Sequence, residues 1–253
     1  MKTKVMAHRG ASAYAPENSL FSFQKAIDMK AQGIELDIYE TADGRLVIHH
    51  DNNIKRISGV DAKISETDFD ILRSYNFSGE WGDKFGFVKI PEFKEVLDLF
   101  KNTDMTINIE MKDGSVNYIK AIDSLVREYG MQERVIYSSF DHFKLESIKQ
   151  INPESKTGAL YAFNMSYPWI YARVAGFTAL HPSYNQIYLY EEMGIDYVKE
   201  AHAHGIKVNA WTANKPGIMR HLAEVGVDNI ITDYPDVALE KIEEAEKAKN
   251  MVL

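Results

Sequence analysis

The sequence predicts an α/β fold, a single (β/α)8 TIM barrel in which a closed ring of parallel strands is surrounded by helices. Short apolar runs alternate with helical patterns through most of the chain, which is typical of repeated βα units. About eight such runs can be recognised, the strand number of this barrel. A length of 253 residues also suits one barrel. We therefore expect one domain over residues 1–253.

The expected strands are spread along the whole chain. Each is a short apolar run bounded by turn or helix signals. They cover residues 5–8, 33–39, 106–111, 134–138, 157–161, 177–181, 207–211 and 229–232.

Helices are expected between these strands. The clearest cover 19–29, 116–129, 142–151 and 198–204, and Gly205 ends the last of these. Asn18 is expected to cap the first helix, since its side chain can bond the free N–H groups of a first turn. A further helix is expected from Pro235 to about residue 249, ending as a charged, solvated segment.

The interval 42–90 departs from this alternation because it is too long for a single loop. It carries a hairpin signal, Asp43-Gly44, which is followed by the apolar run 46–48. We interpret the interval as a small insertion after the second strand. Such insertions in a barrel lie on the face formed by the carboxyl ends of the strands, where barrel enzymes hold their active sites.

Composition excludes several classes of partner. A net charge of −8 without a basic run argues against nucleic acid and against a polybasic membrane patch. No apolar run approaches the roughly 20 residues that span a bilayer, and the first residues do not resemble a signal peptide. We expect a cytoplasmic protein without nucleic-acid partner or stable membrane association.

The chain contains no cysteine, so a metal would need oxygen or imidazole ligands. The oligomeric state stays open.

Two acids alternate with apolar residues in the segment 33–39. The period of two places Glu35 and Asp37 on one face of the strand. Strands of a parallel sheet are normally apolar on both faces, so two inward carboxylates would repel each other and lose hydration. A bound cation would resolve both problems. The alternative is that they are solvated at the strand end or paired with basic side chains, and this segment alone favours neither interpretation.

A third acid appears in the segment 106–112, where the same alternation brings Glu110 to the polar face. If the barrel prediction holds, Glu35, Asp37 and Glu110 converge from adjacent strands. An oxygen cluster without cysteine suits Mg²⁺, Ca²⁺ or Mn²⁺ better than Zn²⁺. Lys112 shares the face of Glu110 and could meet a substrate anion, form a salt bridge to Glu110, or do both.

Histidines stand at two strand ends, in His8-Arg9-Gly10 and in His49-His50-Asp51. A lone histidine is usually structural, but two beside a metal site can supply the acid and base that cleavage of a phosphodiester needs. Arg9 offers a planar fork for phosphate oxygens, although a carboxylate partner is equally natural in so acidic a chain.

Two aromatic residues follow expected strands. Trp211 closes the run 207–211, and Phe140 follows the run 134–138. Trp211 could pack a flat face against the carbons of a polyol at the strand end, whereas core packing is the commoner fate of tryptophan. Phe140 carries the same ambiguity.

Taken together, these motifs resemble those of the glycerophosphodiester phosphodiesterase family in their order and spacing. The resemblance spans nearly the whole chain. It rests on His8-Arg9-Gly10, Pro16-Glu17-Asn18, Glu35-Leu36-Asp37, His50-Asp51, Glu110-Met111-Lys112, Trp211-Thr212 and Thr232-Asp233-Tyr234-Pro235.

The resemblance implies a TIM barrel with an insertion after the second strand and one divalent cation, Mg²⁺ or Ca²⁺ with Mn²⁺ possible. It places the cation on Glu35, Asp37 and Glu110 and makes His8 and His50 the acid–base pair. It also places Arg9 and Lys112 against the phosphate. We also expect Trp211 and Phe140 to contact the substrate, together with Arg9 and Lys112.

Two departures from the family pattern stand out. Ser19 replaces the threonine that often follows Pro-Glu-Asn, and it keeps the hydroxyl. Two adjacent histidines stand where one is expected. Neighbours on an extended strand point to opposite faces, so only one of His49 and His50 can readily face the metal. The match to His-Asp selects His50.

The implied activity is hydrolysis of a small glycerophosphodiester to an alcohol and sn-glycerol 3-phosphate, with His8 favoured as base and His50 as acid. The attacking oxygen is water or the neighbouring glycerol hydroxyl. Alternatives are a lysophospholipase D-like enzyme, a lyase acting on carbon acids, or a non-catalytic phosphate-binding barrel. The histidine pair argues against a lyase, which more naturally has a single base opposite a bound Mg²⁺. A binding barrel has no need of an acid–base pair.

Overall fold

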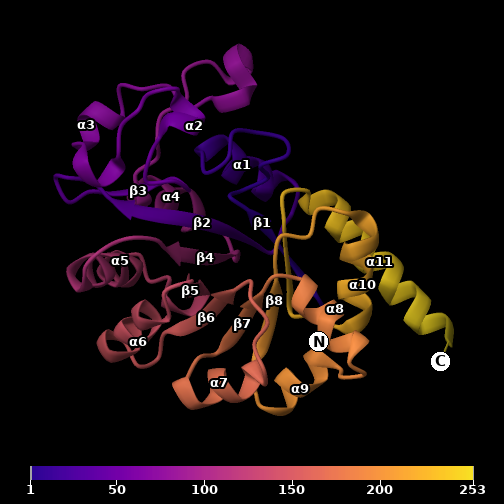
Figure 1. Cartoon of the computed structure of the whole chain (residues 1–253). Helices are drawn as coiled ribbons and strands as arrows, with labels where there is room; N and C mark the ends of the chain where they lie inside the picture. Colours follow the sequence, from indigo (N-terminus) through magenta and orange to yellow (C-terminus); the bar gives the residue numbers. More distant parts are fainter. Residues whose placement is uncertain (1, 253) are drawn as a thin grey trace.

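The computed structural model describes residues 2–252, and eight parallel strands within it close into a ring. β1 pairs with β2 on one side and with β9 on the other, so the ring has no free edge. Helices surround the ring, and the chain runs around it in sequence order (Figure 1). The predicted (β/α)8 barrel is therefore confirmed. Its strands are β1 (Lys4–His8), β2 (Gly33–Glu40), β4 (Thr106–Met111), β5 (Val135–Ser139), β6 (Lys156–Tyr161), β7 (Ala179–Pro182), β8 (Lys207–Ala210) and β9 (Asn229–Thr232).

The helices of the outer layer pack on the apolar outer face of the ring. Apolar side chains of strands and helices form one continuous cluster there, in which Phe23, Ile109 and Tyr118 are buried. The helices are α1 (Leu20–Asp28), α4 (Phe93–Phe100), α5 (Val116–Glu128), α6 (His142–Ile151), α7 (Pro168–Ala175), α8 (Asn185–Glu192), α9 (Tyr197–Ala203), α10 (Pro216–Val225) and α11 (Pro235–Val252), with a short 3-10 turn η3 (Gln132–Arg134).

The predicted hairpin is present and carries one strand outside the ring. β3 (Leu46–Ile48) runs antiparallel to β2, with Tyr39 opposite Val47. Gly44 at the turn has φ +79°, in the left-handed region that glycine adopts without strain. The hairpin therefore extends β2 beyond the barrel and starts the insertion.

The rest of the insertion consists of short helices above one side of the ring, seen in purple at the top of Figure 1. They are α2 (Lys55–Ser58), η1 (Ile64–Glu66), α3 (Phe69–Leu72) and η2 (Gly79–Phe85). They pack around an apolar cluster of their own that includes Ile54, Phe77 and Ile90. Because the cluster also contains Tyr39 and Val47 of the hairpin, it attaches the insertion to the extended end of β2.

The start of α1 differs from the expectation. Ser19, not Asn18, caps the helix, because its hydroxyl accepts a bond from the Ser22 N–H at 3.2 Å and its backbone is extended, as a cap requires. Asn18 has a left-handed backbone (φ +52°) and donates its side-chain N–H to Asp37 at 2.8 Å. It therefore supports a buried carboxylate instead of a helix end.

Several other boundaries shift by a few residues. The strand expected over 134–138 is Val135–Ser139, and that expected over 177–181 is Ala179–Pro182. The helix expected over 198–204 starts at Tyr197, because Asp196 caps it by accepting a bond from Lys199 N–H. β8 ends one residue before Trp211. None of the described helices is both long and apolar enough to cross a membrane.

Candidate active site

A cavity of about 90 Å³ lies at the carboxyl ends of the barrel strands. One side of it is polar and charged, and the other is apolar. It is lined by His8, Arg9, Glu35, His50, Asn108, Glu110, Phe140, Leu160, Trp211, Thr212 and Ile231. The barrel thus brings together most of the residues singled out in the sequence.

The three predicted acids form one cluster. Glu35 and Asp37 are two residues apart on β2, and Asp37 is paired in register with Glu110 on β4. One carboxylate oxygen of each residue lies within 4.8 Å of those of the other two. Glu35 and Asp37 are only 4% and 1% exposed, so water screens their mutual repulsion poorly.

This crowding shifts the affinity of each carboxyl for protons. Burial, and then the charge of Asp37, raise the pKa of Glu110 to about 7, and the same causes hold the pKa of Glu35 well above its ordinary value. Burial opposes ionisation of Asp37 too, but Lys112 and Arg9 outweigh it and lower the pKa of this carboxyl. Without a cation, the cluster therefore retains protons near neutral pH on its glutamates.

The residues of the cluster fit a hard divalent cation. The buried oxygen atom Asn108 Oδ1 has no hydrogen-bond donor among the described residues, and Asp37 Oδ1 has only the Lys112 ammonium, 3.1 Å away. Buried acceptors without a partner carry a desolvation cost, which a bound ion or its water ligands would remove. Carboxylate and amide oxygens are the ligands that Mg²⁺ and Ca²⁺ prefer.

Removing the charge of Glu110 is expected to stabilise the metal-free protein. Its raised pKa favours the folded state at acidic pH, and this contribution is lost as pH rises through about 7. At about pH 5 the metal-free parent and metal-free Glu110→Gln should therefore melt at similar temperatures, and at about pH 8 the parent should melt at the lower temperature. Each kcal/mol of repulsion between the ionised Glu110 and its neighbouring carboxylates should lower the melting temperature by about 2–4 °C. Thermal denaturation at both pH values measures this. A difference between the two proteins that does not depend on pH would contradict it.

Lys112 and Arg9 lie among the carboxylates. Lys112 Nζ is 2.6 Å from Glu110 Oε1 and 3.1 Å from Asp37 Oδ1, so the salt bridge considered for Lys112 exists. Arg9 donates to Glu17 at 3.0 Å, and its Nε is 3.5 Å from Asp37 Oδ2. Both cations thus have carboxylate partners beside the cavity.

His8 is held from behind by the carboxylate of Asp233, which lies just after β9. Its Nδ1 donates to Asp233 at 2.6 Å, because a carboxylate can only accept, and Nε2 is left free 4.0 Å from Glu35. Ser12 and Asn214 donate to the same carboxylate at 3.0 and 2.5 Å. The ring of His8 is therefore fixed with Nε2 available for proton transfer.

The two adjacent histidines have different environments. His49 is buried, its Nδ1 lies 2.8 Å from the Asp51 carbonyl oxygen, and its ring packs edge-on against Phe77 at 5.5 Å. His50 lines the cavity and donates from Nδ1 to the Asp51 carboxylate at 2.7 Å. Burial lowers the pKa of both histidines. The chain thus presents His50 to the cavity and His49 to the apolar cluster of the insertion.

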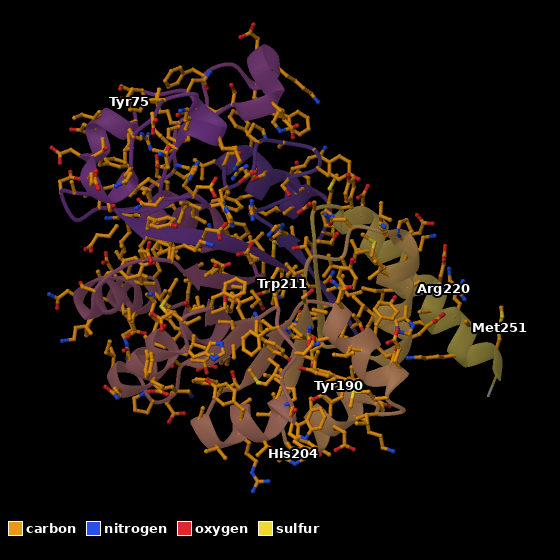
Figure 2. All side chains as sticks on the ribbon, viewed as in Figure 1. Tyr75, Tyr190, His204, Trp211, Arg220 and Met251 are labelled. Carbon is orange, nitrogen blue, oxygen red and sulfur yellow. The ribbon has the colours of Figure 1, made fainter. Side chains whose placement is uncertain are left out.

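The two aromatic candidates form the apolar side of the cavity. Phe140 and Trp211 meet edge to face with their centroids 5.4 Å apart, and the Trp211 indole donates to the His181 carbonyl at 2.7 Å. Trp211 is labelled near the centre of the molecule in Figure 2. Both therefore lie at the cavity instead of in the core.

Four neighbours of the site were not assigned a role in the site itself from the sequence. Asp233 and Asp51 hold the two histidines, Asn18 donates to Asp37, and Arg56 joins Asp51 to Glu17. Asn18, Asp51 and Asp233 stand in the motifs that carry the resemblance, but only Asp51 directly follows the residue that it holds. The others reach the site through contacts between segments distant in the sequence.

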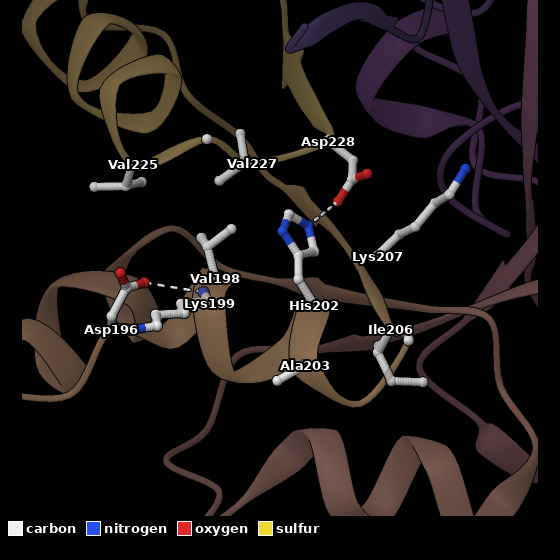
Figure 3. Close-up of a pocket in the computed structure, with 12 residues that line it drawn as sticks. Asp196, Val198, Lys199, His202, Ala203, Ile206, Lys207, Val225, Val227 and Asp228 are labelled. Atoms are coloured by element: carbon white, nitrogen blue, oxygen red, sulfur yellow. Dashed lines mark hydrogen bonds and ion pairs between the residues drawn. The ribbon is translucent and has the colours of Figure 1, made fainter. Parts of the chain in front are cut away.

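A larger cavity of about 770 Å³ lies elsewhere, at the amino ends of β8 and β9 (Figure 3). His202 pairs there with Asp228 at 2.7 Å, and most of the remaining lining is apolar. The only carboxylate triad found in the described range is the one on β2 and β4. Size alone therefore does not identify the reactive centre.

Comparison with known proteins gives a consistent result. The family model described as "Glycerophosphoryl diester phosphodiesterase family" matches residues 8–237. A glycerophosphodiester phosphodiesterase of Caldanaerobacter subterraneus subsp. tengcongensis is 35% identical over 242 residues, covering 94% of this chain and 97% of the relative. A human lysophospholipase D is 25% identical over 268 residues, covering 92% and 84%.

A solved structure agrees with these relatives. The phosphodiesterase of Oleispira antarctica, in complex with its product sn-glycerol-3-phosphate, superimposes with a TM-score of 0.86 at 27% identity. The match covers 96% of this chain and 97% of that one. With the family model matching most of its length, the chain belongs to the glycerophosphoryl diester phosphodiesterase family.

Proposed function

We propose that this protein hydrolyses glycerophosphodiesters to an alcohol and sn-glycerol 3-phosphate. The observation that carries the proposal is the convergence of three carboxylates and two histidines at one end of the barrel. Membership of the family supports the same substrate class, as do the activity by which one relative is named and the product bound in the structure of another.

The cluster of Glu35, Asp37 and Glu110 would hold one divalent cation, Mg²⁺ or Ca²⁺ with Mn²⁺ as a further candidate, which would offset the negative charge of the phosphate. Arg9 and Lys112 are proposed to orient the phosphate oxygens from beside the cluster. Glu17 and Glu110 already hold the side chains of Arg9 and Lys112 in place, so little further ordering of these side chains is needed when substrate binds.

His8 and His50 are proposed to move the protons. One ring takes the proton of the attacking oxygen, which is water or the neighbouring glycerol hydroxyl, as the new P–O bond forms. Attack by the hydroxyl would give a cyclic phosphate, which water must then open to yield sn-glycerol 3-phosphate. The other gives a proton to the departing alkoxide as the old P–O bond breaks. Each ring is held by a carboxylate at Nδ1, which leaves Nε2 for the transfer. We favour His8 as base and His50 as acid.

Trp211 and Phe140 are proposed to pack against the carbons of the substrate on the apolar side of the cavity.

The apolar side of the cavity also suggests a second candidate substrate, a lysophospholipid. Phe140 lines the cavity and is 52% exposed, and Phe143 at the start of α6 and Phe163 shortly after β6 are exposed too. Exposed apolar side chains of this kind would suit an acyl chain. The human relative named as a lysophospholipase D agrees with this alternative.

The proposal predicts release of sn-glycerol 3-phosphate from glycerophosphocholine, with loss of activity in chelator and recovery on adding Mg²⁺ or Ca²⁺. The measurement is an enzyme-coupled assay for the product. Glycerophosphoethanolamine, glycerophosphoglycerol and lysophosphatidylcholine in parallel identify the preferred alcohol or lipid. Turnover that is indifferent to chelator would contradict the cation, and binding without turnover would indicate a phosphate-binding barrel.

A further inference from the structure

Arg56 lies on α2 of the insertion and contacts two carboxylates at once. Its Nε donates to Asp51 at 2.6 Å, and its two terminal nitrogens donate to the two oxygens of Glu17, each at 2.8 Å. All three nitrogens of the guanidinium are therefore used. Asp51 belongs to the segment after β3, whereas Glu17 precedes α1, so the contacts join the insertion to the first loop of the barrel.

Each of these carboxylates holds a residue of the proposed site. The second oxygen of Asp51 accepts from His50 Nδ1 at 2.7 Å. Glu17 Oε1 also accepts from Arg9 at 3.0 Å. A continuous chain of charge-assisted hydrogen bonds therefore runs from His50 through Asp51, Arg56 and Glu17 to Arg9. Among the described residues, Arg56 is the only link in it between Asp51 and Glu17.

We propose that Arg56 is a positioning residue that sets the orientation of His50 through Asp51 and of Arg9 through Glu17. This inference rests on the proposed function. Arg56 is not among the residues that line the cavity, so it acts on the reaction only through the groups that it holds.

Stability is a poor explanation for this arrangement. The Arg56 side chain is 46% exposed, and exposed ion pairs stabilise folded proteins little. Geometry is a better one, because the planar fork can bind both oxygens of Glu17 while Nε points to Asp51. A lysine at this position would keep the charge but could not hold both carboxylates in this geometry.

The other histidine does not depend on the insertion. Asp233 behind His8 is fixed by Ser12 and Asn214, which belong to loops of the barrel itself. The Asp51 carboxylate accepts from Arg56 and His50 alone among the described residues. A change at Arg56 should therefore affect His50 and leave His8 in place.

The test compares Arg56→Lys with Arg45→Lys in the full chain, using glycerophosphocholine at saturating Mg²⁺. Arg45 is the matched control, because it is equally exposed and pairs in a fork with Glu92, away from the cavity. We expect Arg56→Lys to lose about 10- to 100-fold in kcat/KM, with a lower kcat from His50 and a higher KM from Arg9. Arg45→Lys should stay within about twofold of the parent.

If the parent is active and Arg56→Lys matches Arg45→Lys, the positioning role is overturned while the proposed function stands. If the parent protein does not hydrolyse glycerophosphocholine, both the positioning role and the proposed function are overturned.

A second variant separates positioning from folding. Guanidinium ion should restore part of the kcat/KM of Arg56→Ala, and methylammonium, which has no fork, should restore less. If guanidinium and methylammonium restore Arg56→Ala equally, the inference is also overturned. Such a result would show that the variant only loosens the insertion, since a loosened insertion would not distinguish the two cations.

Discussion

Replacing Glu110 with glutamine is expected to lower kcat by about 10²- to 10³-fold at saturating substrate, the cost of losing several kcal/mol of charge stabilisation by a metal. The amide keeps the size of the side chain and one oxygen, but it removes one of the three charges that attract a cation. Mg²⁺ affinity should fall as well. The fold should persist, since the variant also removes a like charge from a buried cluster.

Titration calorimetry with Mg²⁺, run beside steady-state kinetics, measures both effects. Glu40→Gln is a suitable control, because Glu40 is on the same strand as Glu35 and Asp37 but does not line the cavity. Unchanged Mg²⁺ affinity together with full activity in Glu110→Gln would remove Glu110 from the site.

Removing His50 is expected to cost on the order of 10²-fold or more in kcat, as for loss of a general acid or base. His49→Ala should act differently, because this ring is buried against Phe77. It should lower the melting temperature and leave kcat much less affected. Melting curves and kcat for the two alanine variants measure the contrast. A larger loss of kcat in folded His49→Ala would show that the wrong histidine has been assigned to the cavity.

The leaving group separates acid from base in the same variants. An alkyl alcohol leaves poorly without a proton, whereas a nitrophenolate leaves unaided. His50→Ala should therefore lose far more kcat/KM on glycerophosphocholine than on an aryl phosphodiester, and His8→Ala should lose activity on both. Recovery of His8→Ala on the aryl substrate would reverse the two roles. Recovery of neither variant would refute a division into one acid and one base.

The barrel and the carboxylate cluster could be predicted because both depend on short-range patterns. The alternation of βα units predicts the ring, and a period of two places Glu35 and Asp37 on one face. The parallel register then brings Glu110 opposite Asp37. Exact boundaries could not be predicted, because they depend on caps. Asn18 and Ser19 are both good caps, and only the left-handed backbone of Asn18 decides between them.

The supporting groups around the histidines were harder to predict. Arg56 is 39 residues from Glu17, and His8 is 225 residues from Asp233. No local period links residues so far apart. Their contacts exist because the ring closes and the hairpin carries the insertion above it. The sequence thus indicates which groups gather around the cavity, while the packing of distant loops determines what holds them.

The double pairing of β1 also constrains the order in which the site can form. β1 is bonded to β2 near one end of the chain and to β9 near the other, and Asp233 follows β9 directly. During synthesis from the amino end, His8 exists long before its carboxylate partner. Bringing β9 back to β1 closes a long loop, and the entropy that this costs is offset only by the contacts formed when the ring is complete. Until then one edge of β1 has no neighbour, a state that exposes the strand to mispairing. The reactive arrangement is therefore a property of the finished ring, and no shorter amino-terminal segment contains it.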